Sequence, residues 1–334
     1  MRDVLLKLIR RQNLTRDEAR AAFDAILSGD VPDAQIAGFL MGLAVKGVVG
    51  DELAGAAGVM RDKVLSIPRP AHEIVLDTCG TGGTGRNTFN VSTTAAILVA
   101  ACGVKVVKHG NRKASGTSGS ADVLECLGVR LDLSPERLSA CLGQAGLCFA
   151  FARNHHPAMK HVAAARTALG VPTIFNVLGP LTNPARACHQ LLGVYDRPLA
   201  KLLAGVLRDT GSKKAWVVHS DDGLDELSTA APTYVCEVDH GEIREWTLNP
   251  ATLGLAKGSL EPLRVTTPAE SAEMIRGVVN GQPGPAYDIA ALNAAAGLVI
   301  TGAANDLSDG LVRVRHAVEN GNARRVLATL STFA

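Results

Sequence analysis

Two glycine- and hydroxyl-rich segments flank one apolar stretch between residues 74 and 120, and this arrangement constrains the fold more than any other feature. Residues 74–76 are apolar and predict a buried strand that stops at Asp77. Residues 91–102 are almost all small or apolar, which is typical of a buried helix, and residues 104–107 predict the next strand. A strand, a helix and a second strand within about 34 residues form a βαβ unit with parallel strands.

Both polar segments begin where a predicted strand ends. Residues 77–85 read DTCGTGGTG, and residues 108–112 read KHGNR. Open α/β sheets bind ligands outside the carboxyl ends of their strands. Glycines let the backbone approach a ligand closely, and a helix N-terminus adds a positive dipole end. A glycine-rich turn alone would also suit a tight turn, but the two segments together predict a site for a sugar that carries several phosphates.

Composition describes an ordinary water-soluble globular protein. The 334 residues are enough for a large α/β domain and a smaller one, with 47% hydrophobic and 20% charged residues. The net charge of +2 gives no reason to expect a nucleic-acid or membrane partner. No apolar stretch reaches the roughly 18 residues that span a bilayer. The seven cysteines lack Cys-x-x-Cys spacing and no signal peptide precedes them, so we expect reduced thiols and a cytoplasmic location.

The chain divides into a helical beginning and an alternating remainder. Residues 1–65 predict helices without strands, and Thr15 with Glu18 forms a capping-box pattern. A proline-containing linker at residues 66–70 leads into the first strand. Beyond the linker we expect strands at residues 129–131, 147–151, 190–194 and 215–218. We expect helices at residues 120–127 and 158–169, a helix that begins at residue 135, and a helical region over residues 289–330 with a break near 302–309.

Four carboxylates within residues 221–226 form a candidate metal site. Acid-rich loops are usually only solvated. Mg²⁺ in phosphate chemistry, however, is held by one or two carboxylates together with phosphate and water, so we prefer a metal role for Asp225 and Glu226. Lys108 follows the second predicted strand, where a lysine acts as a point charge on a phosphate. We interpret His109 as a hinge or packing residue rather than a base.

Arg166 projects from the apolar face of its predicted helix. Its neighbours at helical spacing include Met159, Val162 and Leu169. A guanidinium in such a setting needs a partner, because an unpaired buried charge is costly. The partner is either an internal carboxylate or the carboxylate of a substrate held by the planar guanidinium fork, and the residues alone leave both alternatives open.

Several motifs in order along the chain resemble those of the anthranilate phosphoribosyltransferase family of tryptophan biosynthesis. The first are GTGG at residues 80–83, NVST at 90–93 and KHGNR at 108–112. The resemblance covers nearly the whole chain, and the later motifs are GSAD at 119–122, HP at 156–157, Arg166, FNVLGPLTNP at 175–184, DGLDE at 222–226 and NAAA at 293–296.

The resemblance implies a fold, a reaction and an assembly. The fold would be α/β: a small all-helical domain, residues 1–68 completed by about 155–183, hinged to a large α/β domain, residues 69–154 and 184–334. A central, mainly parallel sheet flanked by helices would form the large domain. The reaction joins the amine of anthranilate to C1 of phosphoribosyl pyrophosphate, releases pyrophosphate and uses Mg²⁺. Dimers would form through the helical part.

The resemblance also assigns roles to individual positions. The phosphoribosyl donor would contact Gly80, Gly83, Thr84, Thr88, Asn90, Val91, Ser92, Thr93, Lys108, His109, Gly110, Asn111, Arg112, Lys113, Ala114, Ser115, Gly116 and Ser120. Anthranilate would contact Gly80, Asn111 and Arg166, with His156 and Pro157 along its access path. Magnesium would be held by Ser92, Asp225 and Glu226, and the catalytic residues would be Lys108, Asn111 and Arg166.

One position departs from the family pattern, because Thr84 stands where the glycine loop usually has an aspartate. The motifs contain no obvious nucleophile or strong base. The enzyme would therefore position the nucleophilic amine and stabilise charge on the leaving group. Two other readings are a pyrimidine nucleoside phosphorylase-like enzyme and a catalytically silent, nucleic-acid-binding relative. Arg166 with residues 156–157 favours anthranilate over a pyrimidine, and the intact loops with Asp225 and Glu226 argue against a silent relative.

Overall fold

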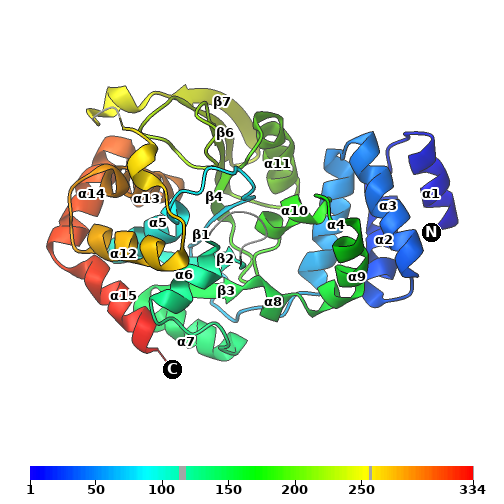
Figure 1. Cartoon of the computed structure of the whole chain (residues 1–334), viewed down its shortest axis with the longest axis horizontal. Coiled ribbons are helices and arrows are strands. Elements are labelled where there is room, and N and C mark those ends of the chain that lie inside the picture. The colour runs from blue at the N-terminus through cyan, green and yellow to red at the C-terminus, as the bar shows by residue number, and fades with distance from the viewer. Residues whose placement is uncertain (113–117, 256–257, 334) are drawn as a thin grey trace.

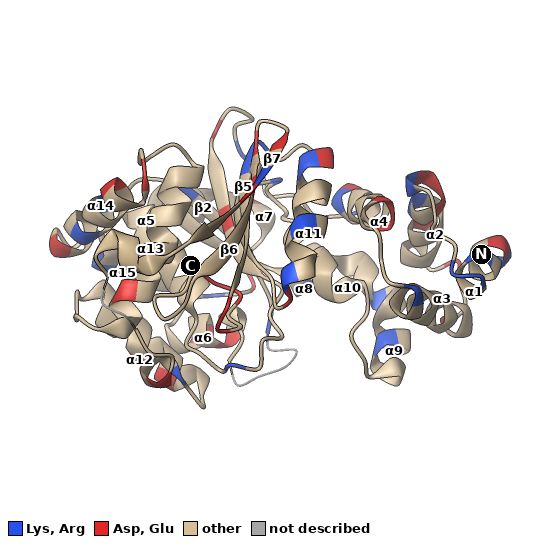
Figure 2. Ribbon diagram, turned by 90° about the horizontal axis from the view of Figure 1, so that it is seen from above, with Lys and Arg blue, Asp and Glu red and all other residues tan. Residues whose placement is uncertain are grey.

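The computed structural model describes residues 1–112, 118–255 and 258–333. A helical lobe lies beside a larger α/β part, and the N-terminus lies in the lobe (Figure 1). The lobe begins with four helices, α1 (Arg2–Ile9), α2 (Arg16–Ser28), α3 (Asp33–Lys46) and α4 (Gly50–Asp62). Helices α9 (Lys160–Leu169) and α10 (Phe175–Leu178), distant in sequence, pack against α2, α3 and α4. Figure 2 shows the same lobe from above, with acidic and basic residues interspersed along its helices.

Local sequence signals explain the helical lobe. The Thr15 hydroxyl accepts a hydrogen bond from Glu18 N at 3.2 Å, and the Glu18 carboxylate accepts one from Thr15 N at 3.0 Å. This capping box satisfies two backbone donors that the start of α2 would otherwise leave free. Inside the lobe the Phe23 ring meets Phe39 and Phe175 edge to face, with ring centres 5.2 and 5.8 Å apart. These apolar contacts join the N-terminal helices to α10 and stabilise the lobe.

The α/β part is built on one sheet of seven strands. Their order is β3-β2-β1-β4-β5-β6-β7, and every pairing from β3 to β5 is parallel, whereas β6 and β7 pair antiparallel. The strands are β1 (Val75–Gly80), β2 (Lys105–Gly110), β3 (Leu147–Phe151), β4 (His189–Gly193), β5 (Lys214–Ser220), β6 (Thr233–Asp239) and β7 (Glu242–Leu248). The sheet is therefore mainly parallel, as the resemblance implied.

Helices cover both faces of the sheet. On one face lie α5 (Val91–Ala101) and α13 (Pro285–Ile300), whose residues share a core with β1 and β2. On the other face α11 (Arg197–Asp209) joins the helical lobe in a second core. Strand β5 shows the division, because Trp216 belongs to the first core and Val217 to the second, as alternation along a strand requires.

The remaining elements complete the α/β part and its connections. They are α6 (Ser120–Cys126), α7 (Pro135–Ala145), α8 (Ala152–His155), α12 (Pro268–Val279), α14 (Leu307–Glu319), α15 (Asn322–Thr332) and the short 3₁₀ helices η1 (Pro157–Met159), η2 (Gly179–Leu181), η3 (Pro250–Leu253) and η4 (Glu261–Leu263). In the part of the chain that is described, no helix combines the length and the apolar character needed to cross a bilayer.

Three sequence-based expectations about elements were wrong, and one pair of strands was missed. Strand β1 does not stop at Asp77 but continues to Gly80, and Lys108 lies within β2 rather than in the loop after it. Residues 129–131 form no strand, because they only connect α6 to α7. The antiparallel hairpin of β6 and β7 was missed, because the exposed face of β7 carries mostly charged and polar side chains that conceal its strand pattern.

Candidate active site

The candidate site lies where the direction of chain winding across the sheet changes. From β1 the chain continues to β2 and β3 on one side, and β4 and β5 lie on the other. Gly80, the last residue of β1, pairs in register with Gly193, the last residue of β4. Such a switch point between parallel strands is where open α/β sheets bind their ligands.

The acidic loop of residues 221–226 packs on these two glycines. A β-carbon on Gly80 would lie 2.5 Å from Asp225 Oδ2, and one on Gly193 would lie 1.6 Å from the Asp225 carbonyl oxygen. Both distances are shorter than any van der Waals contact. Glycine at both strand ends is therefore what allows the acidic loop to reach the switch point.

Backbone donors from the glycine loop and from the start of α5 hold the two acids in place. Gly82 N donates to Asp225 Oδ2 at 3.1 Å, and Ser92 N, at the start of α5, donates to Glu226 Oε1 at 3.2 Å. The glycine loop and the N-terminus of α5 thus meet the acidic loop directly. The structure brings together all three residues predicted to hold metal, namely Ser92, Asp225 and Glu226.

Lys108 lies beneath this cluster with only 3% of its surface exposed. Its ammonium donates to the Thr78 carbonyl oxygen and, at 3.2 Å, to Ser92 Oγ. Burial lowers the pKa of Lys108, while the nearby Asp77 carboxyl opposes that shift. Because β2 carries Lys108 beside β1, the ammonium reaches the base of the glycine loop from within the sheet.

The electrostatics of the acid pair fit a bound cation. Burial, followed by the neighbouring Asp225, raises the pKa of Glu226 to about 8, although Lys108 and Ser92 act in the opposite direction. Burial also raises the pKa of Asp225. Two adjacent carboxylates and a serine hydroxyl are hard oxygen ligands of the kind that Mg²⁺ prefers. A bound cation would stabilise the charged forms of both carboxylates against burial and against each other.

The glycine loop between β1 and α5 follows an irregular path. Gly82, Gly83 and Gly85 have φ values of 64°, 83° and 66°, which lie in the left-handed region that favours glycine. Thr84 Oγ1 accepts a hydrogen bond from Arg86 N at 3.3 Å, so its hydroxyl shapes the turn. Thr88, further along, forms an isolated bridge with Arg264.

The start of α5 carries one polar side chain that is hydrogen-bonded within the protein and one that has no partner among the described residues. Asn90 Oδ1 accepts hydrogen bonds from Ser118 Oγ at 3.0 Å and Ser271 Oγ at 2.9 Å, which fix its amide. Thr93 is buried, and its hydroxyl has no hydrogen-bond partner among the described residues. Val91 is also buried and packs in the core. The Thr93 hydroxyl lies in the first turn of α5, at the helix end whose dipole favours anions.

His109 and His156 form a buried pair beside the second segment. Their Nε2 atoms lie 3.3 Å apart, and His109 Nδ1 lies 3.0 Å from the Gly179 carbonyl oxygen. Burial lowers the pKa of His109 to about 3 and that of His156 to about 4. Both rings are therefore neutral near pH 7. The neutral, buried ring of His109 supports its interpretation as a packing residue. The contact between the two histidines connects β2 to the segment before η1.

The end of the second segment is held by α6. Asn111 O accepts a hydrogen bond from Ser120 Oγ at 3.3 Å, and a β-carbon on Gly110 would lie 2.3 Å from the same hydroxyl. Arg112 pairs with the α6 acids Asp122, at 3.0 Å, and Glu125, at 2.7 Å. Its guanidinium is thus already engaged within the protein. The predicted donor contacts Lys113, Ala114, Ser115 and Gly116 lie outside the described residues.

Arg166 stands apart from the hydrogen-bonded cluster. Its guanidinium carbon lies 5.3 Å from the centre of the Phe175 ring, and burial lowers its pKa. Over the described ranges 1–112, 118–255 and 258–333, no carboxylate lies within ion-pair distance of Arg166. This favours the alternative in which the guanidinium serves a ligand. Pro157 begins η1 at an exposed position next to His156.

Two residues near the site were missed from the sequence. Gly193 ends a strand that was predicted, and its position resembles that of Gly80, but pairing of the two strand ends cannot be read from a linear pattern. Tyr195 N donates to Thr81 Oγ1 at 3.2 Å, and the Tyr195 ring lies 3.8 Å from where a β-carbon on Gly83 would stand. The tyrosine therefore covers the outer side of the glycine loop.

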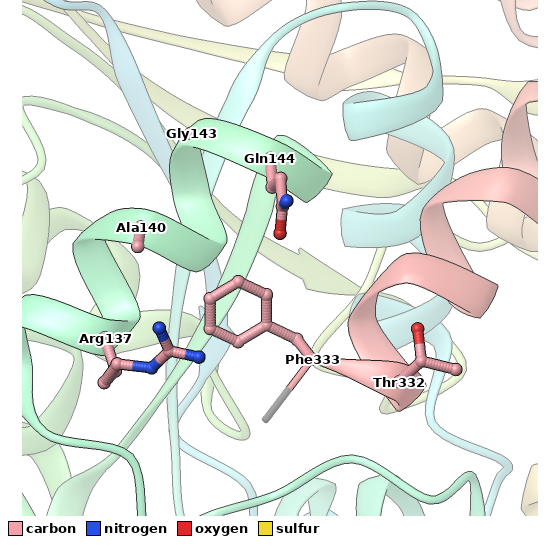
Figure 3. Close-up of a pocket in the computed structure, with 6 residues that line it drawn as sticks. All are labelled: Arg137, Ala140, Gly143, Gln144, Thr332 and Phe333. Carbon is pink, nitrogen blue, oxygen red and sulfur yellow. The ribbon is translucent and has the colours of Figure 1, made fainter.

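A separate groove lies between α7 and α15 (Figure 3). The guanidinium of Arg137 lies over the Phe333 ring, 4.7 Å from its centre. The groove contains none of the predicted site residues; its lining residues are Arg137, Ala140, Gly143, Gln144, Thr332 and Phe333. The switch point therefore remains the candidate active site.

Comparisons with known proteins agree with this geometry. Residues 2–64 match the family described as "Glycosyl transferase family, helical bundle domain", and residues 72–324 match "Glycosyl transferase family, a/b domain". Anthranilate phosphoribosyltransferase of Methylobacterium sp. (strain 4-46) is 52% identical, covering 98% of this chain and 96% of the relative. The protein of the same name from Methylobacillus flagellatus is 46% identical, with 99% and 97% covered.

Solved structures give the same result. The crystal structure of anthranilate phosphoribosyltransferase from Thermus thermophilus has a TM-score of 0.91 and 39% identity, and 99% of each chain is covered. The Saccharomyces cerevisiae enzyme in complex with phosphoribosyl pyrophosphate and Mg has a TM-score of 0.89 and 28% identity, with 98% of this chain and 96% of that chain covered. The chain therefore belongs to the anthranilate phosphoribosyltransferase family.

Proposed function

We propose that this protein transfers the phosphoribosyl group of phosphoribosyl pyrophosphate to the amine of anthranilate in tryptophan biosynthesis. The products are N-(5-phosphoribosyl)anthranilate and pyrophosphate. The observation that carries the proposal is the cluster of Lys108, Ser92, Asp225 and Glu226 at the switch point. It places one ammonium, backbone N–H donors and two carboxylates at the carboxyl ends of β1 and β4, where a polyanionic sugar and its metal would bind.

The donor's diphosphate would lie over the glycine loop and the N-terminus of α5. Ser92, Asp225 and Glu226 would hold Mg²⁺, which supplies positive charge for the departing pyrophosphate. Lys108 is fixed below the same point by its hydrogen bonds to Thr78 and Ser92 and adds a second positive charge there. Because the charge that develops on the leaving group meets preorganised donors, the transition state is stabilised relative to the bound donor.

The acceptor would bind from the side of the helical lobe. Arg166 has no carboxylate partner among the described residues, and its planar fork would hold the carboxylate of anthranilate. Gly80 and Asn111 would position the amine, with His156 and Pro157 along the access path. The amine is itself the nucleophile, so correct placement against C1 of the ribose supplies much of the catalysis.

Domain movement and assembly are part of the same proposal. The helical domain would comprise residues 1–68 with about 155–183, and closure on the α/β domain would bring Arg166 toward the switch point. Dimers would form through this domain, where Leu6, Ile9 and Val45 are 41%, 77% and 63% exposed. Light scattering of the purified protein tests the dimer. A cytoplasmic location is supported by the seven cysteines, all of which are unpaired.

The experiment that tests the activity is product identification by mass spectrometry. Purified protein is incubated with Mg²⁺, phosphoribosyl pyrophosphate and anthranilate, and separately with phosphate and pyrimidine nucleosides. We expect N-(5-phosphoribosyl)anthranilate and pyrophosphate in the first reaction and no phosphorolysis in the second. Release of free pyrimidine base without any anthranilate adduct would overturn the proposal in favour of a nucleoside phosphorylase.

A further inference from the structure

Arg86 is the single cationic residue between Asp77 and Thr93, and it extends from the glycine loop onto the acidic loop. A β-carbon on Gly223 would lie 2.7 Å from Arg86 Nη2 and 3.0 Å from Nε. The guanidinium therefore lies directly against the Gly223 backbone, in space that only glycine leaves open. Gly223 has a φ of 84°, which also favours glycine.

The guanidinium of Arg86 has free donors in this position. Within the described part of the chain, no carboxylate lies within ion-pair distance of it. Asp222, which precedes Gly223, is engaged within its own loop: Oδ1 accepts from Leu224 N at 3.3 Å, and Oδ2 accepts from Ser228 Oγ at 2.6 Å. The residues from 78 to 93 contain no acid that would compete for the arginine. A cation beside an acidic loop is therefore left available for an anionic ligand.

A hydrogen bond and two positive φ values shape the backbone around Arg86. Its N–H donates to Thr84 Oγ1 at 3.3 Å, and its neighbours Gly85 and Asn87 have φ values of 66° and 53°. The threonine that replaces the usual aspartate of the family thus shapes the turn that presents Arg86, and it adds no negative charge there. The same loop is tied to the acid pair through Gly82 N and Asp225 Oδ2, 3.1 Å apart.

We propose that Arg86 binds the diphosphate end of phosphoribosyl pyrophosphate and contributes to recognition of the donor. The inference rests on the proposed function, because it assigns a residue to the donor site of that reaction. Arg86 belongs to the same loop as Gly82, whose N–H donates to Asp225, and it contacts Gly223, two residues before Asp225. A diphosphate bound over this junction would therefore lie beside the guanidinium. Two N–H donors of a planar fork match two oxygens of a phosphate, which a lysine cannot reproduce.

The test compares Arg86→Gln and Arg86→Lys with Arg325→Gln, which removes one exposed positive charge from α15. The glutamine variant should raise the KM for phosphoribosyl pyrophosphate roughly 10-fold and leave the KM for anthranilate within about 2-fold. The lysine variant should recover part of the loss, and Arg325→Gln should match the parent protein. Arg86 is exposed, so unchanged thermal unfolding curves should accompany these effects.

Inhibitors identify which end of the donor Arg86 contacts. Inhibition by pyrophosphate with Mg²⁺ should weaken about as much as the KM rises, whereas inhibition by ribose 5-phosphate should not change. Calorimetric titration with pyrophosphate and Mg²⁺ should show the same loss of affinity without turnover. Unchanged pyrophosphate binding, or a loss confined to ribose 5-phosphate, would overturn the assignment. A parent protein that forms no anthranilate adduct would overturn the proposed function, while the calorimetric comparison would still decide the role of Arg86.

Discussion

The carbonyl oxygen of Asp225 lies 1.6 Å from the position that a β-carbon on Gly193 would take. The acidic loop therefore packs directly against the end of β4, and no side chain could fit between them. This packing also means that the positions of the two carboxylates proposed to hold Mg²⁺ depend on the absence of a side chain at Gly193. The site is therefore sensitive to a change of one methyl group at the switch point.

Gly193→Ala should displace the acidic loop and reduce activity. We expect a loss of about 1–3 kcal/mol in the free energy of unfolding, as for other overpacked positions, and a larger fall in turnover because Asp225 moves. Gly205→Ala is the matched control, since a β-carbon on Gly205 of α11 meets nothing within 4 Å. Urea unfolding and initial rates check both variants. Parent-like turnover in Gly193→Ala would contradict the dependence of the acid pair on this glycine.

Removing the charges of the acid pair should abolish most turnover while the fold is retained. The double variant Asp225→Asn, Glu226→Gln keeps the shapes of both side chains but loses the negative charge that attracts Mg²⁺. We expect turnover to fall roughly 100-fold or more, with partial recovery at high Mg²⁺. Asp221→Asn, an exposed acid of the same loop, should behave like the parent protein. If the double variant works at ordinary Mg²⁺, the two acids belong to a solvated loop.

The raised pKa of Glu226 predicts how stability depends on pH without metal. Its pKa is about 8 in the folded protein, above the ordinary value of 4.5. The folded state therefore holds a proton that the unfolded chain has lost across this interval, and the stability contributed by the group is lost as pH rises through it. Denaturant unfolding is measured at pH 5.5 and pH 8 in the presence of a chelator. The free energy of unfolding should fall more between these two pH values for the parent than for Glu226→Gln. An equal change in the free energy of unfolding with pH in both proteins would argue against the raised pKa of Glu226.

Arg166→Ala should raise the KM for anthranilate far more than the KM for the donor. Loss of one charged, two-pronged contact costs about 2–3 kcal/mol, or roughly 30- to 150-fold. Lys160→Ala, at an exposed position on the same helix, provides the control. Steady-state kinetics with each substrate varied in turn separates the two constants. An unchanged anthranilate constant in a folded, active Arg166→Ala protein would remove Arg166 from the acceptor site.

The fold class could be predicted from the sequence, and so could several residues that the structure brings together at the switch point, because the relevant signals are local. The capping box at Thr15, the apolar helix α5 and the glycine loop each depend on residues close together in the chain. What could not be predicted depends on packing between distant segments. The fit of Asp225 against Gly193 and of Arg86 against Gly223 follows from strand order and loop geometry, which periodicity does not encode.

Lys108 illustrates the same distinction. Its residue type and motif predicted a phosphate-binding charge, but its neighbours suggested a loop rather than a strand. In the structure β2 extends to Gly110, because its later residues pair in register with β3. The lysine is therefore buried, and its orientation toward Thr78 and Ser92 is fixed by the sheet. A charged residue within a buried strand breaks the usual pattern, and such exceptions concentrate at functional sites.

Loss of anthranilate fluorescence catalysed by the purified protein measures the proposed transfer directly. Initial rates are measured with both phosphoribosyl pyrophosphate and Mg²⁺, and with each omitted in turn. We expect rapid loss of fluorescence only when both are present, and no loss after Lys108→Met in a protein that unfolds like the parent. Persistent fluorescence in the complete reaction, or an equal rate without the donor or without Mg²⁺, would contradict the proposed transfer at the switch point.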